Sequence, residues 1–144
     1  MKKIIFIMII FLFIPINIYA ISDNYEDKIN DIVNVEKEEN KINLYLFHSK
    51  DCSHCADERE WLKEIKKDYK DYLNIYEYEV TYNEENRQLM KSVTDKLSIN
   101  IDSVPFTIIG NDYYTGFSET TESILENKIK EYLELESNPN EVKI

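Results

Sequence analysis

Apolar and polar residues alternate along this chain with two periodicities, one typical of strands and one typical of helices. An apolar run at residues 42–47 and an alternating run at residues 74–80 are typical of strands. Residues 104–109 predict a third strand, with a proline near its start, where the missing N–H is tolerated. Gly110-Asn111-Asp112 predicts a turn, and residues 113–115 a short returning strand.

Helical spacing fills the intervals between these strands. From Cys55 onward one apolar stripe is predicted, formed by Leu62, Ile65, Tyr69 and Tyr72 with Trp61 beside them. The other positions of this helix are charged: Asp57, Glu58, Arg59, Glu60, Lys63, Glu64, Lys66 and Lys67. Asn83 is expected to cap a second helix that starts near Glu84, and Ser118 or Thr120 a third.

The predicted order is therefore strand, helix, strand, helix, strand, strand, helix. Because a helix connects the first two strands, we expect them to lie parallel, whereas the last two form a hairpin. The fold class is α/β.

Both ends of the chain differ from this core in character. Residues 1–20 resemble a secretory signal with two lysines, an apolar stretch and a cleavage site after Ala20; an uncleaved membrane anchor is the alternative. Either interpretation places the protein outside the cytoplasm. Residues 21–41 are polar, and we expect a loosely attached helix there. Residues 136–144 are expected to form a frayed tail.

The net charge of the chain limits the kinds of molecule that it is expected to bind. The chain has 28 acidic and 17 basic residues, a net charge of −11 at pH 7. A surface this acidic argues against nucleic-acid binding and against docking on anionic membranes.

The chemistry of the chain is concentrated in the motif Cys52-Ser53-His54-Cys55, which holds its only two cysteines. Two thiols at this spacing can close a small disulfide ring and open it again. The motif stands where a strand gives way to a helix, and the backbone N–H groups at a helix start stabilise a thiolate. In an oxidising compartment such a pair meets substrates rich in disulfides.

Two other interpretations of the cysteines stay open. A structural disulfide is one, although the chain-entropy model gives so small a ring only about 2 kcal/mol. A metal site formed by Cys52, Cys55, His48 and His54 is the other. It is disfavoured because the neighbours His54 and Cys55 are poorly placed to bind one ion together, and no second Cys or His pair completes a zinc site.

Together with Val104-Pro105 at the start of the third strand, the dithiol resembles that of the thioredoxin-fold family, over residues 42–135. The resemblance implies a thioredoxin-like domain, β-α-β-α-β-β-α, with a mixed four-stranded sheet flanked by helices. It implies that Cys52 attacks and Cys55 resolves, that Pro105 is a cis-proline lying against the dithiol, and that Val104 pairs its backbone with a bound substrate segment.

The sequence also departs from the family pattern. Asp51 stands where many thioredoxins have Trp, and Leu46 where they have a buried acid that helps the second cysteine lose its proton. Glu77 and Glu79 are candidates for that acid by strand position, although exposure to solvent is the expected state of both. No glutathione-binding set can be traced, so a glutaredoxin is not supported. We expect no cofactor and no bound metal.

The leading hypothesis is an extracytoplasmic thiol-disulfide oxidoreductase that acts on protein thiols and disulfides and is recycled by a membrane redox partner. His54, tethered between the cysteines, is expected to stabilise the Cys52 thiolate and make the protein more oxidising, whereas Asp51 opposes this. The alternatives are a non-catalytic module of the same fold that binds a partner or a metal, and a reductant dedicated to one client protein.

Overall fold

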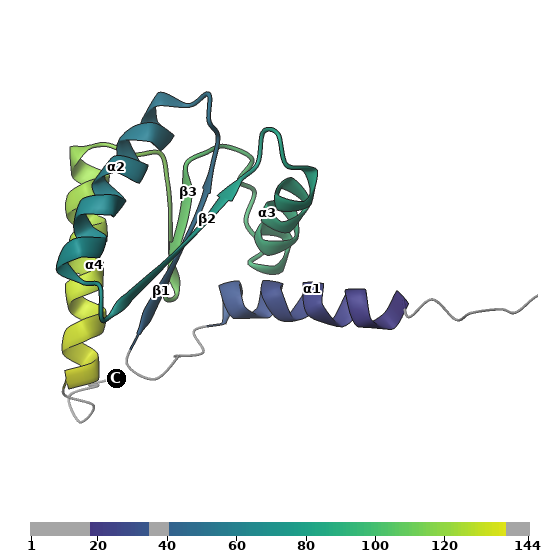
Figure 1. The fold of residues 1–144 in the computed structure, drawn as a ribbon, viewed down its shortest axis with the longest axis horizontal. Coiled ribbons are helices and arrows are strands. Elements are labelled where there is room, and N and C mark those ends of the chain that lie inside the picture. The colour runs from purple at the N-terminus through teal and green to yellow at the C-terminus, as the bar shows by residue number, and fades with distance from the viewer. Residues whose placement is uncertain (1–17, 35–40, 138–144) are drawn as a thin grey trace, which may run out of the picture.

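The computed structural model describes residues 18–34 and 41–137 (Figure 1). Its elements are α1 (Ile18–Val33), β1 (Ile42–His48), α2 (Ser53–Asp68), β2 (Leu73–Glu79), α3 (Glu84–Lys96), β3 (Phe106–Ile109), β4 (Asp112–Thr115) and α4 (Glu119–Ser137). From β1 onward this is the predicted order.

One mixed sheet organises the domain, with the strand order β2-β1-β3-β4. β1 runs parallel to β2 and antiparallel to β3, and β3 forms a hairpin with β4. Figure 1 shows α2 and α4 together on one side of the sheet, away from α1 and α3. The α/β class and the mixed four-stranded sheet predicted from the sequence are confirmed.

Each face of the sheet has its own apolar core, because alternate residues of β1 point to opposite faces. The face under α2 and α4 is built from Ile42, Leu44, Leu46, Leu62, Ile65, Leu73, Ile109, Phe117, Leu125 and Ile129. The face under α1 and α3 is built from Ile29, Ile32, Tyr45, Phe47, Val80, Leu89, Met90, Val93, Phe106 and Ile108.

The expectation of a loosely attached helix before residue 42 is wrong in one respect. The helix exists, but Ile29 and Ile32 are buried in the core. The Tyr45 hydroxyl also donates a hydrogen bond to the Asp31 carbonyl at 3.1 Å. α1 therefore covers one face of the sheet as an integral part of the domain.

The ends of the chain lie mostly outside the described residues. The expected signal is described only from Ile18, where α1 begins, and the expected tail only to Ser137, where α4 ends. Within residues 18–34 and 41–137, no helix is long and apolar enough to cross a membrane.

The hairpin requires glycine at its turn. Gly110 has a φ of +55°, and a Cβ there would stand 2.1 Å from the Tyr132 hydroxyl. That hydroxyl accepts a hydrogen bond from the Asn111 N–H at 3.0 Å, so α4 is fastened to the turn. Glycine alone satisfies both the left-handed backbone and the close approach.

Candidate functional site

Cys52 caps the N-terminus of α2 and is the first residue of the site. Its backbone is extended (φ −107°, ψ 119°), and its sulfur accepts a hydrogen bond from the Cys55 N–H at 3.2 Å. The first turn of a helix presents N–H groups without helical partners, so this sulfur occupies the place of an N-cap oxygen. Cys52 is partly exposed and carries a free thiol. A substrate can therefore reach it.

Cys55 lies one turn further along α2 and is fully buried. Burial, followed by the hydrogen bond with Cys52, raises the pKa of the Cys55 thiol to about 12. At neutral pH Cys55 therefore keeps its proton. It needs a base before it can act as a nucleophile.

Val104, in the loop before β3, lies against Cys52, and Pro105 follows it. The Val104–Pro105 peptide bond is cis. The Cys52 thiol lies 3.7 Å from the Val104 carbonyl oxygen, close enough to donate a weak hydrogen bond to it. The structure thus brings together two segments about fifty residues apart in the sequence.

Ser53 and His54 occupy the first two helical positions of α2, and both are exposed. Their side chains therefore lie at the solvent side of the dithiol, whereas Cys55 turns inward.

Glu58 is the buried acid of the site, and the sequence pattern placed it wrongly among the exposed charged positions of the helix. It is only 1% exposed, and Thr107 of β3 donates a hydrogen bond to its carboxylate. Burial raises the pKa of Glu58 to about 7, although the Thr107 hydrogen bond acts in the opposite direction. The charge of Glu58 also disfavours the thiolate of Cys55, so the two groups interact.

A signal for Glu58 was present in the sequence. The buried residues of α2 are Cys55, Glu58, Leu62 and Ile65, at spacings of three, four and three. This is one continuous helical stripe. Extending the stripe forward to Tyr72 was wrong, because α2 ends at Asp68 and the chain turns there to enter β2, which leaves Tyr72 51% exposed.

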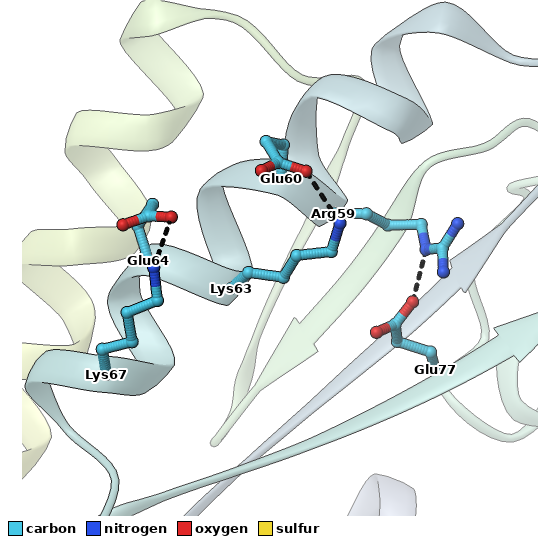
Figure 2. Close-up of polar contacts among 6 residues, drawn as sticks. All are labelled: Arg59, Glu60, Lys63, Glu64, Lys67 and Glu77. Atoms are coloured by element: carbon cyan, nitrogen blue, oxygen red, sulfur yellow. Dashed lines mark hydrogen bonds and ion pairs between the residues drawn. The ribbon is translucent and has the colours of Figure 1, made fainter.

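The two carboxylates proposed from strand position have other partners. Figure 2 shows Arg59 reaching from α2 to the Glu77 carboxylate on β2, with which it forms an ion pair. Glu79 accepts hydrogen bonds from the N–H groups of Thr81 and Tyr82, both at 2.9 Å. The expectation that both are solvent-accessible fits better than a role beside Cys55.

His48, at the end of β1, is buried. Its Nε2 lies 3.9 Å from a Glu77 carboxylate oxygen, and its Nδ1 has no hydrogen-bond partner among the described residues. Burial, together with the Arg59 charge, lowers the pKa of His48. Within residues 18–34 and 41–137, no three His, Cys, Asp or Glu side chains form a group that could hold a metal ion.

Solved structures with the same arrangement of elements are thioredoxins and their relatives. The thioredoxin of Malassezia sympodialis is 15% identical over 74% of this chain and 84% of its own, with a TM-score of 0.50. That of Trichomonas vaginalis is 21% identical over 75% of this chain and 90% of its own, also at 0.50. The chain adopts the thioredoxin fold.

A third solved structure of this thioredoxin fold is assigned as the thiol:disulfide interchange protein DsbE of Chlorobium tepidum. It is 11% identical over 65% of this chain and 81% of its own, with a TM-score of 0.51. No protein-family model matches the sequence, and a search of curated proteins finds no match. At these identities the likeness establishes the fold, and the chemistry is argued from the residues of this chain.

Proposed function

We propose that this protein is a thiol-disulfide oxidoreductase whose Cys52–Cys55 pair exchanges disulfides with protein substrates. The observation that carries the proposal is the asymmetry of the two thiols. The Cys52 sulfur is accessible at the start of α2 and accepts a hydrogen bond from the Cys55 N–H. Cys55 itself is buried one turn further along the helix. An accessible nucleophile backed by a protected second thiol can form a mixed disulfide and then resolve it.

In the reducing direction, the Cys52 thiolate attacks one sulfur of a substrate disulfide. The substrate S–S bond breaks, a new bond joins Cys52 to the attacked sulfur, and the other substrate sulfur leaves as a thiolate that takes up a proton. Val104 supports this step. Its carbonyl lies beside the Cys52 sulfur, where its backbone can pair with an extended substrate segment.

The second step needs a base for Cys55. We assign this role to Glu58, because a carboxyl group with a pKa of about 7 is half ionised at neutral pH and interacts with Cys55 inside the protein. Glu58 takes the Cys55 proton, and Cys55 attacks the Cys52 sulfur. The substrate leaves as its second thiolate, and the protein is left with a Cys52–Cys55 disulfide. Run in reverse, the same steps oxidise a substrate dithiol.

A membrane redox partner is part of the proposal, since each turnover changes the oxidation state of the dithiol and a second redox component has to restore it. The acidic character of the chain supports protein substrates over nucleic acid. The alternative of a non-catalytic binding module is disfavoured by the free, partly exposed Cys52 thiol.

Reduction of insulin in dithiothreitol tests the proposal. The wild-type protein should accelerate the precipitation of the insulin chains, and Cys52→Ala should precipitate them no faster than dithiothreitol alone. A wild-type rate equal to that of dithiothreitol alone would favour the non-catalytic module.

His54 is proposed to favour the oxidising direction. Its exposed imidazole follows Cys52 by two residues, and a nearby N–H donor stabilises the thiolate, which exists only in the reduced form. His54→Pro should therefore make the reduction potential more negative, by about 30 mV if the contact contributes about 1.4 kcal/mol. Equilibration of both proteins with glutathione buffers measures this. Equal potentials would remove His54 from the proposed site.

An extracytoplasmic location is proposed from residues 1–20, whose composition is that of a secretory signal. The expected N-terminus of the mature protein is Ile21, which mass spectrometry of the protein purified from its natural compartment can identify. An intact residue 1–20 segment in a soluble cytoplasmic pool would contradict export.

A further inference from the structure

The loop that precedes the dithiol is joined to the loop between β2 and α3 by two short side-chain hydrogen bonds. Thr81 donates its hydroxyl to Ser49 Oγ at 2.6 Å, and Tyr82 donates its hydroxyl to Asp51 Oδ2, also at 2.6 Å. The Asp51 N–H donates to the same Ser49 Oγ at 3.1 Å. Asp51, the residue directly before Cys52, is therefore held through both its backbone and its side chain.

Tyr82 is itself fixed in place, although its side chain is largely exposed. Its relative exposure is 70%, yet its N–H donates to the Glu79 carboxylate at 2.9 Å, and so does the N–H of Thr81. The hydrogen bond to Asp51 raises the pKa of Tyr82, so the phenol keeps its proton and remains a donor at neutral pH. An exposed tyrosine with both its backbone and its hydroxyl engaged presents that hydroxyl in one position.

The Asp51 carboxylate, which accepts the Tyr82 hydrogen bond, belongs to the residue directly before Cys52. A carboxylate close to a sulfur disfavours the thiolate by repulsion between like charges. Cys52 is the N-cap of α2, so its sulfur is stabilised by the helix start, and the charged Asp51 directly precedes it in the chain. A donated O–H offsets part of that charge and keeps the carboxylate directed to the β2–α3 loop.

We propose that Tyr82 is a positioning residue, which holds the Asp51 carboxylate in place and thereby keeps the Cys52 thiol reactive. The inference rests on the proposed function of the dithiol. It adds that the reactivity of Cys52 is set in part from a loop about thirty residues away in the sequence, through the Tyr82–Asp51 hydrogen bond. Tyr82 acts through Asp51 and forms no bond with the substrate.

The test is a double-mutant cycle with Tyr82→Phe, Asp51→Asn and the combined variant. The readout is the rate at which iodoacetamide alkylates Cys52 at pH 7, together with the reduction potential in glutathione buffers. Tyr82→Phe should lower the alkylation rate about threefold, as expected when one screened surface charge gains influence. Its reduction potential should become more negative. Tyr72→Phe, a partly exposed tyrosine just before β2, is the control and should change neither quantity.

The combined variant decides between charge and loop structure. If Tyr82 acts through the Asp51 charge, Tyr82→Phe should have no further effect once Asp51 is asparagine. If Tyr82→Phe has the same effect in both backgrounds, or none in either, the inference is wrong. These readouts use no substrate protein. The result of the double-mutant cycle can therefore be interpreted even if the protein fails to reduce insulin.

Discussion

Cys55→Ala is expected to accumulate covalent complexes between this protein and its substrates. Without Cys55, the mixed disulfide on Cys52 has no internal thiol to resolve it, so the complex persists until an external thiol reaches it. The partial burial of Cys52 slows that external attack. Affinity purification under non-reducing conditions, followed by electrophoresis with and without dithiothreitol, measures the yield of complexes.

The matched control is Cys52→Ala, which should trap nothing, because the remaining Cys55 thiol is fully buried and burial raises its pKa. The combined variant should likewise trap nothing. Equal yields of complexes from Cys55→Ala and Cys52→Ala would contradict the assignment of Cys52 as the attacking thiol.

Glu58→Gln is expected to stabilise the protein while slowing its chemistry. Burial raises the folded-state pKa of Glu58 from 4.5 to about 7, so the protonated form is favoured by folding. Its contribution to stability is fully present below pH 4.5 and is lost as the pH rises through 7. Glutamine stays neutral throughout. Above pH 7 the variant should therefore gain about 3 kcal/mol in free energy of unfolding, with little difference at pH 4.

The same substitution removes the proposed base for Cys55. The resolving step should slow by about 100-fold at pH 7, the lower end of the range for general base catalysis. In the wild type this rate should rise with pH and level off above about 7, as Glu58 ionises. In Glu58→Gln the rise should continue to higher pH, because burial still raises the pKa of the Cys55 thiol. Stopped-flow release of a fluorescent thiol from its mixed disulfide with Cys52 gives the rate.

Glu77→Gln is the control for both effects, since Glu77 also faces α2 but pairs with Arg59 near the surface (Figure 2). It should leave the resolving rate and its pH profile unchanged. A slow resolving step in Glu77→Gln, with a normal rate in Glu58→Gln, would transfer the base to Glu77.

The fold was predictable because its signals are local and repeated. The apolar run at residues 42–47, the alternation at residues 74–80 and the turn at Gly110 each depend on neighbouring residues. The approach of Val104 to the dithiol was expected for a different reason, since the resemblance to the thioredoxin-fold family implied it. The antiparallel pairing of β1 with β3 brings the end of β1 next to the start of β3, and the Cys52 thiol contacts the Val104 carbonyl there.

Glu58 and α1 were not predictable in the same way. The sequence shows that Glu58 is charged, but its burial depends on how α2 is rotated over the sheet. In the folded protein that rotation brings Glu58 to Thr107 of β3, which donates a hydrogen bond to it. Residues 21–41 are mostly polar, and Ile29 and Ile32 form only a narrow apolar stripe among them. The burial of these two side chains requires a face of the sheet that is open to α1. In both cases the local spacing is compatible with burial, but the tertiary contacts decide it.

An equilibrium titration shows whether Cys52 and Cys55 form one reversible redox couple. The protein is incubated over a range of reduced and oxidised glutathione, free thiols are alkylated, and intact mass is measured. Both thiols should disappear together as an intramolecular disulfide, at one midpoint that fits a two-electron couple. Two free thiols at every ratio, or stable glutathione adducts in place of the internal disulfide, would contradict it.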